Sequence, residues 1–107
     1  MSTPQVQQII TEMGSRLGAN SGLGGTLKFD FGDVGSVYID GKSAPNSVAD
    51  GANKSADCTI TLTLETFEKI YRGEMDPTSA FMQGKLRVAG DMGLAMKLSP
   101  ILQKARG

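Results

Sequence analysis

The sequence lacks several side chains on which enzymes and metal proteins commonly depend. Its 107 residues include no histidine and a single cysteine, Cys58. Histidine is the commonest general base, and the familiar zinc sites need several histidine or cysteine ligands. One cysteine also excludes a disulfide within the chain. We therefore expect a protein that is not an enzyme, with no catalytic residue, no metal site and no cofactor.

The sequence also has no excess of charge of either sign and no long apolar run. Eleven Lys and Arg residues balance eleven Asp and Glu residues, which leaves a formal net charge of zero and no field to attract nucleic acid. No apolar run approaches the ~20 residues of a membrane span, and residues 1–16 lack the basic and apolar regions of a signal peptide. These absences predict a cytoplasmic protein without a signal peptide or a nucleic-acid partner.

The remaining composition is typical of a globular protein. The chain is 39% hydrophobic and 21% charged, and no internal repeat or low-complexity tract interrupts it. A chain of this length can bury enough surface to form a core without disulfides. The sequence therefore predicts one domain over residues 1–107.

Apolar residues at helical spacing, together with capping residues, predict five helices. The first covers residues 4–17, where the apolar positions recur three and four residues apart. Asp76-Pro77 and Ser99-Pro100 are strong start signals, because the side chain caps free N–H groups and proline needs none. Asp91 supplies another cap. The other predicted helices cover residues 65–72, 77–83, 92–98 and 100–106.

Strict alternation of apolar and polar residues predicts strands between these helices. The clearest strand is residues 57–64, where Cys58, Ile60 and Leu62 alternate with aspartate and threonine. Other strands are predicted at residues 25–31 and 36–40, at a short edge within 43–49, and at 85–89. Each strand has one apolar face. The order of elements predicts an α+β fold in which helices cover one face of a mainly antiparallel sheet.

The C-terminal segment is unusually apolar. Lys97 is its only charged residue between Asp91 and Lys104. A helix that is apolar nearly all round must be enclosed on several sides or must face an apolar cavity. The segment therefore either completes the core, forms a seam between two copies, or borders a cavity. Its apolar residues are Met92, Leu94, Ala95, Met96, Leu98, Ile101 and Leu102.

Two other features give weaker signals. Cys58 lies on the apolar side of its strand, and no histidine is present to lower its pKa, so a buried structural thiol is the favoured interpretation. Lys85 and Arg87 project from one face of a strand, which suits either an anionic head group or plain exposure to solvent.

Two segments resemble a known family. They read ADCTIT at residues 56–61 and MDPTSAFMQGKLRVAGDMGLAMKL at residues 75–98. Both closely resemble the sterol carrier protein 2 family, most strongly over residues 56–98 and more loosely over the whole domain. The resemblance implies a five-stranded, mostly antiparallel sheet, covered on one face by about five helices and enclosing a hydrophobic tunnel.

The resemblance also implies a function. It indicates an intracellular carrier that binds and transfers sterol, fatty acid, fatty acyl-CoA or phospholipid without catalysis. In the family motif the residue at Gln83 lies near the tunnel, where it can hydrogen-bond a ligand oxygen; the alternative is a helix-terminal residue that faces water. Carried over by position, the lipid tunnel would be bordered by Phe67, Ile70, Phe81, Met82, Gln83, Met92, Ala95, Met96, Leu98, Ile101 and Leu102.

A second hypothesis treats the chain as an accessory or interaction module of a lipid-metabolising enzyme. Members of the resembled family also occur fused behind dehydrogenase or thiolase domains. In that role the apolar C-terminal face would contact the enzyme, and a transient contact with a membrane is a further expectation. The chain ends in KARG at residues 104–107, which is no peroxisomal signal, so we do not expect peroxisomal delivery.

Overall fold

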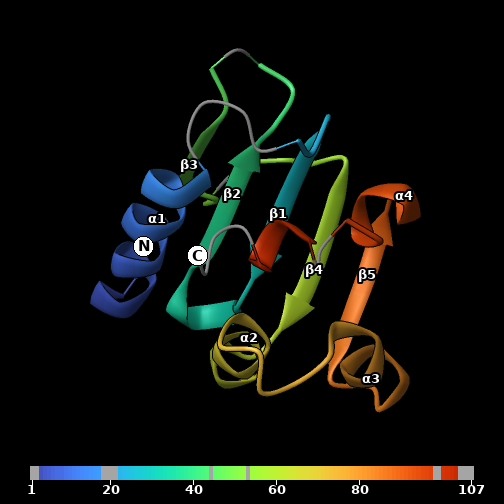
Figure 1. The fold of residues 1–107 in the computed structure, drawn as a ribbon. Coiled ribbons are helices and arrows are strands. Elements are labelled where there is room, and N and C mark those ends of the chain that lie inside the picture. Colours follow the sequence, from blue (N-terminus) through green and yellow to red (C-terminus); the bar gives the residue numbers. More distant parts are fainter. Residues whose placement is uncertain (1–2, 18–21, 44, 53, 98–99, 104–107) are drawn as a thin grey trace.

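The described part of the chain contains one five-stranded sheet with helices along one face (Figure 1). The computed structural model describes residues 3–17, 22–43, 45–52, 54–97 and 100–103. The β1–β4 pair is parallel and the other three pairs are antiparallel, which confirms the predicted mostly antiparallel sheet. In the sheet order β3-β2-β1-β4-β5, the strands are β3 (Ser47–Asp50), β2 (Ser36–Asp40), β1 (Thr26–Asp30), β4 (Cys58–Leu62) and β5 (Leu86–Gly90).

Four α-helices and a helical turn at residues 100–103 match the predicted helices in position. α4 is shorter than the predicted 92–98, and Leu98 and residues 104–106 lie outside the described residues. Within the described ranges, every helix is too short or too polar to cross a membrane. The helices are α1 (Pro4–Leu17), α2 (Leu64–Tyr71), α3 (Pro77–Met82) and α4 (Met92–Ala95), with a 3-10 turn η1 (Gly32–Val34).

The core lies between the sheet and the helices. Alternate residues of β1, β2 and β4 point inward and are fully buried, as the alternation predicts. Phe67 of α2 packs edge-on against Phe29 of β1 at 5.0 Å between ring centroids, and in a tilted arrangement against Phe31 at 5.1 Å. α1 packs against β2 and β3 through five buried apolar residues. The two halves of the sheet are therefore covered by different helices.

Side-chain caps fix where three of the helices begin. The Asp76 Oδ1 atom accepts a hydrogen bond from the Thr78 N–H at 2.8 Å, and Asp91 Oδ1 accepts one from the Gly93 N–H at 2.8 Å. Both caps were predicted from the sequence. Thr63 also caps α2, because its Oγ1 atom accepts from the Thr66 N–H at 3.1 Å. This cap ends the predicted strand 57–64 two residues early, at Leu62.

The link between β3 and β4 contacts the face of the sheet opposite the helices. Lys28 and Tyr38 are paired across β1 and β2. The Lys28 Nζ donates to the Lys54 carbonyl at 3.2 Å, and the Lys54 Nζ lies 5.3 Å from the centre of the Tyr38 ring. These contacts of the β3–β4 link therefore lie away from the face of the sheet on which the helices pack.

The close approach of β4 and β5 at Gly90 yields a first prediction. Gly90 has φ +108°, and a Cβ atom there would overlap the Asp57 carbonyl oxygen. We expect Gly90→Ala to lower the free energy of unfolding by about 2–4 kcal/mol, because the backbone must shift as well as adopt a strained φ. Urea denaturation measures this change.

Gly14→Ala is the matched control. A Cβ at Gly14, within α1, makes only an ordinary contact with the Val48 Cβ at 3.7 Å. This variant should be more stable than the parent by about 1 kcal/mol, as alanine favours helix. Equal stability of the Gly90→Ala variant and the parent protein would contradict the described β4–β5 register.

Candidate functional site

An apolar hollow lies beside β5, between α3 and α4. We call it the β5 hollow; its volume is about 210 Å³. Its floor comes from the inward face of β4 and β5, and its ends come from the two short helices. Thr78 is the one polar side chain of its lining, and no charged side chain is among the described lining residues. They are Ile60, Pro77, Thr78, Phe81, Leu86, Val88, Met92, Ala95 and Met96.

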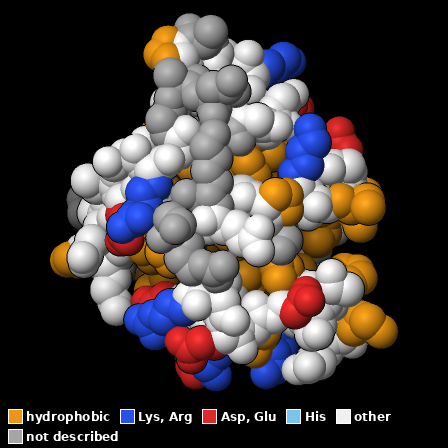
Figure 2. All heavy atoms as spheres, in the orientation of Figure 1, with side chains coloured by type: hydrophobic (Ala, Val, Ile, Leu, Met, Phe, Trp, Pro, Cys, Tyr) orange, Lys and Arg blue, Asp and Glu red, His pale blue; other side chains and the backbone are white. Residues whose placement is uncertain are grey.

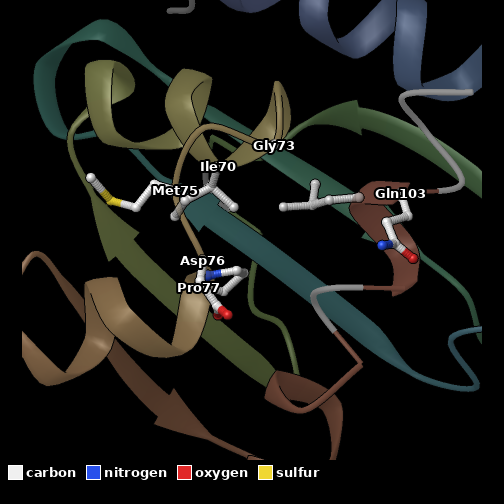
Figure 3. A pocket seen from close by; sticks show the side chains of 7 residues that line it. Ile70, Gly73, Met75, Asp76, Pro77 and Gln103 are labelled. Carbon is white, nitrogen blue, oxygen red and sulfur yellow. The ribbon is translucent and has the colours of Figure 1, made fainter.

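A second hollow lies between the end of α2 and the helical turn at residues 100–103. We call it the α2 hollow; its volume is about 180 Å³. Figure 3 shows Ile70, Asp76 and Pro77 on one side of it and Gln103 on the other. Met75 and Leu102 also belong to its lining, so its wall mixes apolar and polar groups.

Pro77 belongs to both hollows, which are therefore adjacent. Its position follows from the local sequence, since Asp76 caps the first turn of α3 and proline suits the position after the cap. Each hollow is smaller than the ~300–1,000 Å³ of ordinary ligand pockets, whereas the two together exceed the lower limit. A ligand of lipid size would therefore have to extend past Pro77.

The structure distributes the described tunnel residues over the core, the exposed end of α3 and the two hollows. Phe67 and Ile101 are buried in the core instead of bordering a hollow. Met82 and Gln83, at the end of α3, are exposed and are not among the lining residues of either hollow. Leu98 lies outside the described residues. The remaining predicted residues line the β5 hollow (Phe81, Met92, Ala95 and Met96) or the α2 hollow (Ile70 and Leu102).

Several lining residues were missed from the sequence. Ile60, Leu86 and Val88 come from strands, and their alternation indicated only that they face inward. The Asp76-Pro77 pair predicts only where a helix begins, and no local pattern indicates that Pro77 and Thr78 line a hollow. Among the described residues, the walls form two partly open hollows that meet at Pro77. One continuous tunnel therefore stays a prediction.

Lys85 and Arg87 line a different groove, of about 480 Å³, where β4 ends and β5 begins. Arg87 is paired with Thr61 across the strands, and both side chains are exposed. Neither cation lines the β5 hollow or the α2 hollow. The structure thus places both cations on solvent-exposed positions, in a groove that shares Leu86 with the β5 hollow.

Cys58 is a buried free thiol, as predicted. Burial raises the pKa of the Cys58 thiol, and the nearby Asp91 carboxylate raises this pKa further. A thiol whose ionisation is disfavoured in this way is a poor nucleophile. Cys58 is therefore a packing residue of β4.

The fold and the hollows define a small α+β domain that leaves apolar surface open between short helices. Residues 6–103 match the family model of the SCP-2 sterol transfer family. The chain belongs to this family.

Known relatives agree with this assignment. Sterol carrier protein 2 of Homo sapiens is 50% identical over 60 residues, which are 56% of this chain and 11% of that protein. The crystal structure of Sterol Carrier Protein 2 Like 2 from Aedes aegypti has a TM-score of 0.71 and 29% identity, covering 90% of this chain and 94% of that one. The solution structure of the palmitated form of that mosquito protein has a TM-score of 0.67 and 29% identity, covering 95% of both chains.

The raised pKa of Cys58 predicts how stability depends on pH. The Cys58 thiol ionises near pH 8.5 in the unfolded chain and at a higher pH in the folded protein. Its contribution to the stability of the folded state is therefore fully present below pH 8.5 and is lost as the pH rises through the folded pKa. The Tyr71 pKa is raised by burial and by Glu12, which adds a loss of the same sign at higher pH. We expect the midpoint of thermal unfolding to fall between pH 8 and pH 9.5.

Cys58→Ala is the comparison for this measurement. The variant has lower stability at neutral pH because it leaves a small void, but its unfolding midpoint should fall less steeply over this pH range. An equally steep fall in both proteins would show that the thiol does not ionise on unfolding in this range.

Proposed function

We propose that the chain is a non-catalytic lipid carrier that takes one long hydrocarbon chain into the β5 hollow. The observation that carries the proposal is the lining of this hollow, which is apolar except for Thr78 and contains no charged side chain. Replacing water with hydrocarbon at such a surface lowers the free energy of the system. Membership in the SCP-2 sterol transfer family supports lipid binding or transfer in general.

A fatty acid is the ligand that we favour among fatty acid, fatty acyl-CoA, sterol and phospholipid. The similar mosquito protein has been solved in a palmitated form. The flexible side chains of Met92 and Met96 can adapt to a mobile acyl chain better than a rigid wall can. An extended chain is also thin enough to run past Pro77 from one hollow into the other.

A charged group in the wall of the α2 hollow favours one orientation of a bound fatty acid. The Asp76 carboxylate belongs to its wall, and this charge would repel a second carboxylate. A fatty acid would therefore place its tail toward the α2 hollow and its carboxylate at the open side of the β5 hollow. Gln83 is exposed on the last turn of α3, so we propose no ligand contact for it.

The energetics suit reversible carriage. Burial of a sixteen-carbon tail gives a gross gain on the order of 13 kcal/mol, from which association subtracts roughly 4–15 kcal/mol. A bilayer interior is as apolar as the hollow, so the tail gains little by moving from one to the other. Exchange between a membrane and the protein is then nearly balanced, which a carrier requires. The cytoplasmic location stays a prediction.

Met96→Arg tests the assignment of the β5 hollow. Met96 lines the hollow and is 81% exposed, so the variant should fold normally while its charge blocks hydrocarbon from the lining. We expect the dissociation constant of a fluorescent fatty acid to rise at least tenfold. Leu102 is less suitable, because it is 3% exposed and an arginine there would disrupt the core.

Met82→Arg is the matched control. Met82 has the same side chain and is 80% exposed, but it is not a lining residue of the hollow. This variant should bind the fluorescent fatty acid within about twofold of the parent protein. Equal loss in both variants, or no loss in either, would reject the β5 hollow as the binding site.

A second candidate function is an accessory module of a lipid-metabolising enzyme. It is favoured by one observation, which is that the matched segment spans 11% of the human relative. In a longer protein the domain would deliver lipid to, or dock on, a neighbouring catalytic domain. Lipid retained by protein purified from its own source supports carriage, whereas a lipid-free complex supports the accessory role.

A further inference from the structure

Exposed large hydrophobic side chains are concentrated in one region of the described chain. They are Phe81 at 49% exposure, Met82 at 80%, Met92 at 53% and Met96 at 81%. All four belong to α3, to α4 or to the residue that follows α4. Figure 2 shows hydrophobic side chains gathered along the edge of the molecule where α3, β5 and α4 lie. We call these four residues the methionine face.

The size of the methionine face limits what can cover it. Large side chains present ~150–250 Å² each, so at these exposed fractions the four present on the order of 500 Å². Patches of this size on a monomer are often functional. A stable dimer buries about 800 Å² on each partner, and the methionine face is smaller than that. The methionine face is therefore better suited to a partner, such as a lipid surface, that does not need a large complementary protein interface.

The methionine face is continuous with the β5 hollow. Phe81, Met92 and Met96 belong both to the face and to the lining of the hollow, so an acyl chain can leave the hollow between exposed apolar side chains. A bilayer pressed against this face would receive the chain without exposing it to water. By contrast, the Val, Ile, Leu and Met side chains of α1 are at most 9% exposed, because they pack on the sheet.

We propose that the methionine face is the surface by which the chain docks on a lipid bilayer when it loads or releases its ligand. The proposal rests on the proposed lipid carriage and names the partner of the same site. Flexible methionine side chains can insert among lipid acyl chains without fixed geometry. The four side chains of the methionine face carry no charge, so docking through them depends on apolar contact and changes little with salt.

The absence of tryptophan allows a sharp test with single-tryptophan variants. Met82→Trp places an indole on the methionine face, and Gln8→Trp places one on the exposed side of α1. Each protein is mixed with phosphatidylcholine vesicles that carry brominated acyl chains. We expect the Met82→Trp emission to be quenched at least threefold more than the Gln8→Trp emission, to the same extent at 50 mM and 500 mM salt.

Met82→Glu separates docking from lipid binding. It should reduce association with phosphatidylcholine vesicles about tenfold, while binding of a fluorescent fatty acid in vesicle-free solution stays within twofold of the parent. Equal quenching at both tryptophan positions, or quenching at neither, overturns the docking surface. Sedimentation that shows a dimer, lost in Met82→Glu, also overturns it and assigns the face to a second copy.

The same measurements distinguish failure of the proposed lipid carriage from failure of the proposed docking surface. If the parent protein fails to bind the fluorescent fatty acid but Met82→Trp is still selectively quenched, lipid carriage is wrong and the docking surface stands. If the parent binds the fatty acid and the vesicle results are negative, the carrier role stands and docking through this face is wrong.

Discussion

Unequal helix length on the two halves of the sheet is the constraint on which the site depends. α1 is 14 residues long and covers β2 and β3, whereas α3 has six residues and α4 has four. The short helices cover the inward face of β4 and β5 incompletely, so the buried Ile60 and Leu86 and the partly exposed Val88 also border a hollow. The same alternating strand pattern thus produces a fully covered face on one half and a face that borders an apolar hollow on the other.

Local capping determines where the uncovered surface lies. Asp76 and Asp91 start the helices on either side of β5, and each cap holds its helix near one end of the strand. Pro77 directly follows the first capping residue and lines both hollows. Exposure of Met92 and Met96 follows from the same geometry, because four residues of helix cannot bury every apolar side chain that α4 carries.

The sequence was a good guide to the fold and a partial guide to the hollows. Strand alternation and the aspartate caps depend on neighbouring residues, so β4, α3 and the start of α4 could be predicted locally. The family resemblance places Phe67 and Ile101 at a tunnel by position alone, and in this structure both side chains are buried in the core. Helical periodicity adds only that such residues face inward. Whether an inward residue meets protein or empty space depends on the lengths of distant helices, which no local pattern reports.

The most direct test of the central claim is an NMR titration of protein labelled with ¹³C at the methionine methyl groups. Palmitate is added to the folded protein, and the methyl signals of Met92 and Met96 are compared with that of Met13, which is fully buried between α1 and the sheet. The account predicts that Met92 and Met96 shift in a saturable manner while Met13 stays unchanged. Unchanged Met92 and Met96 signals at saturating palmitate would contradict it.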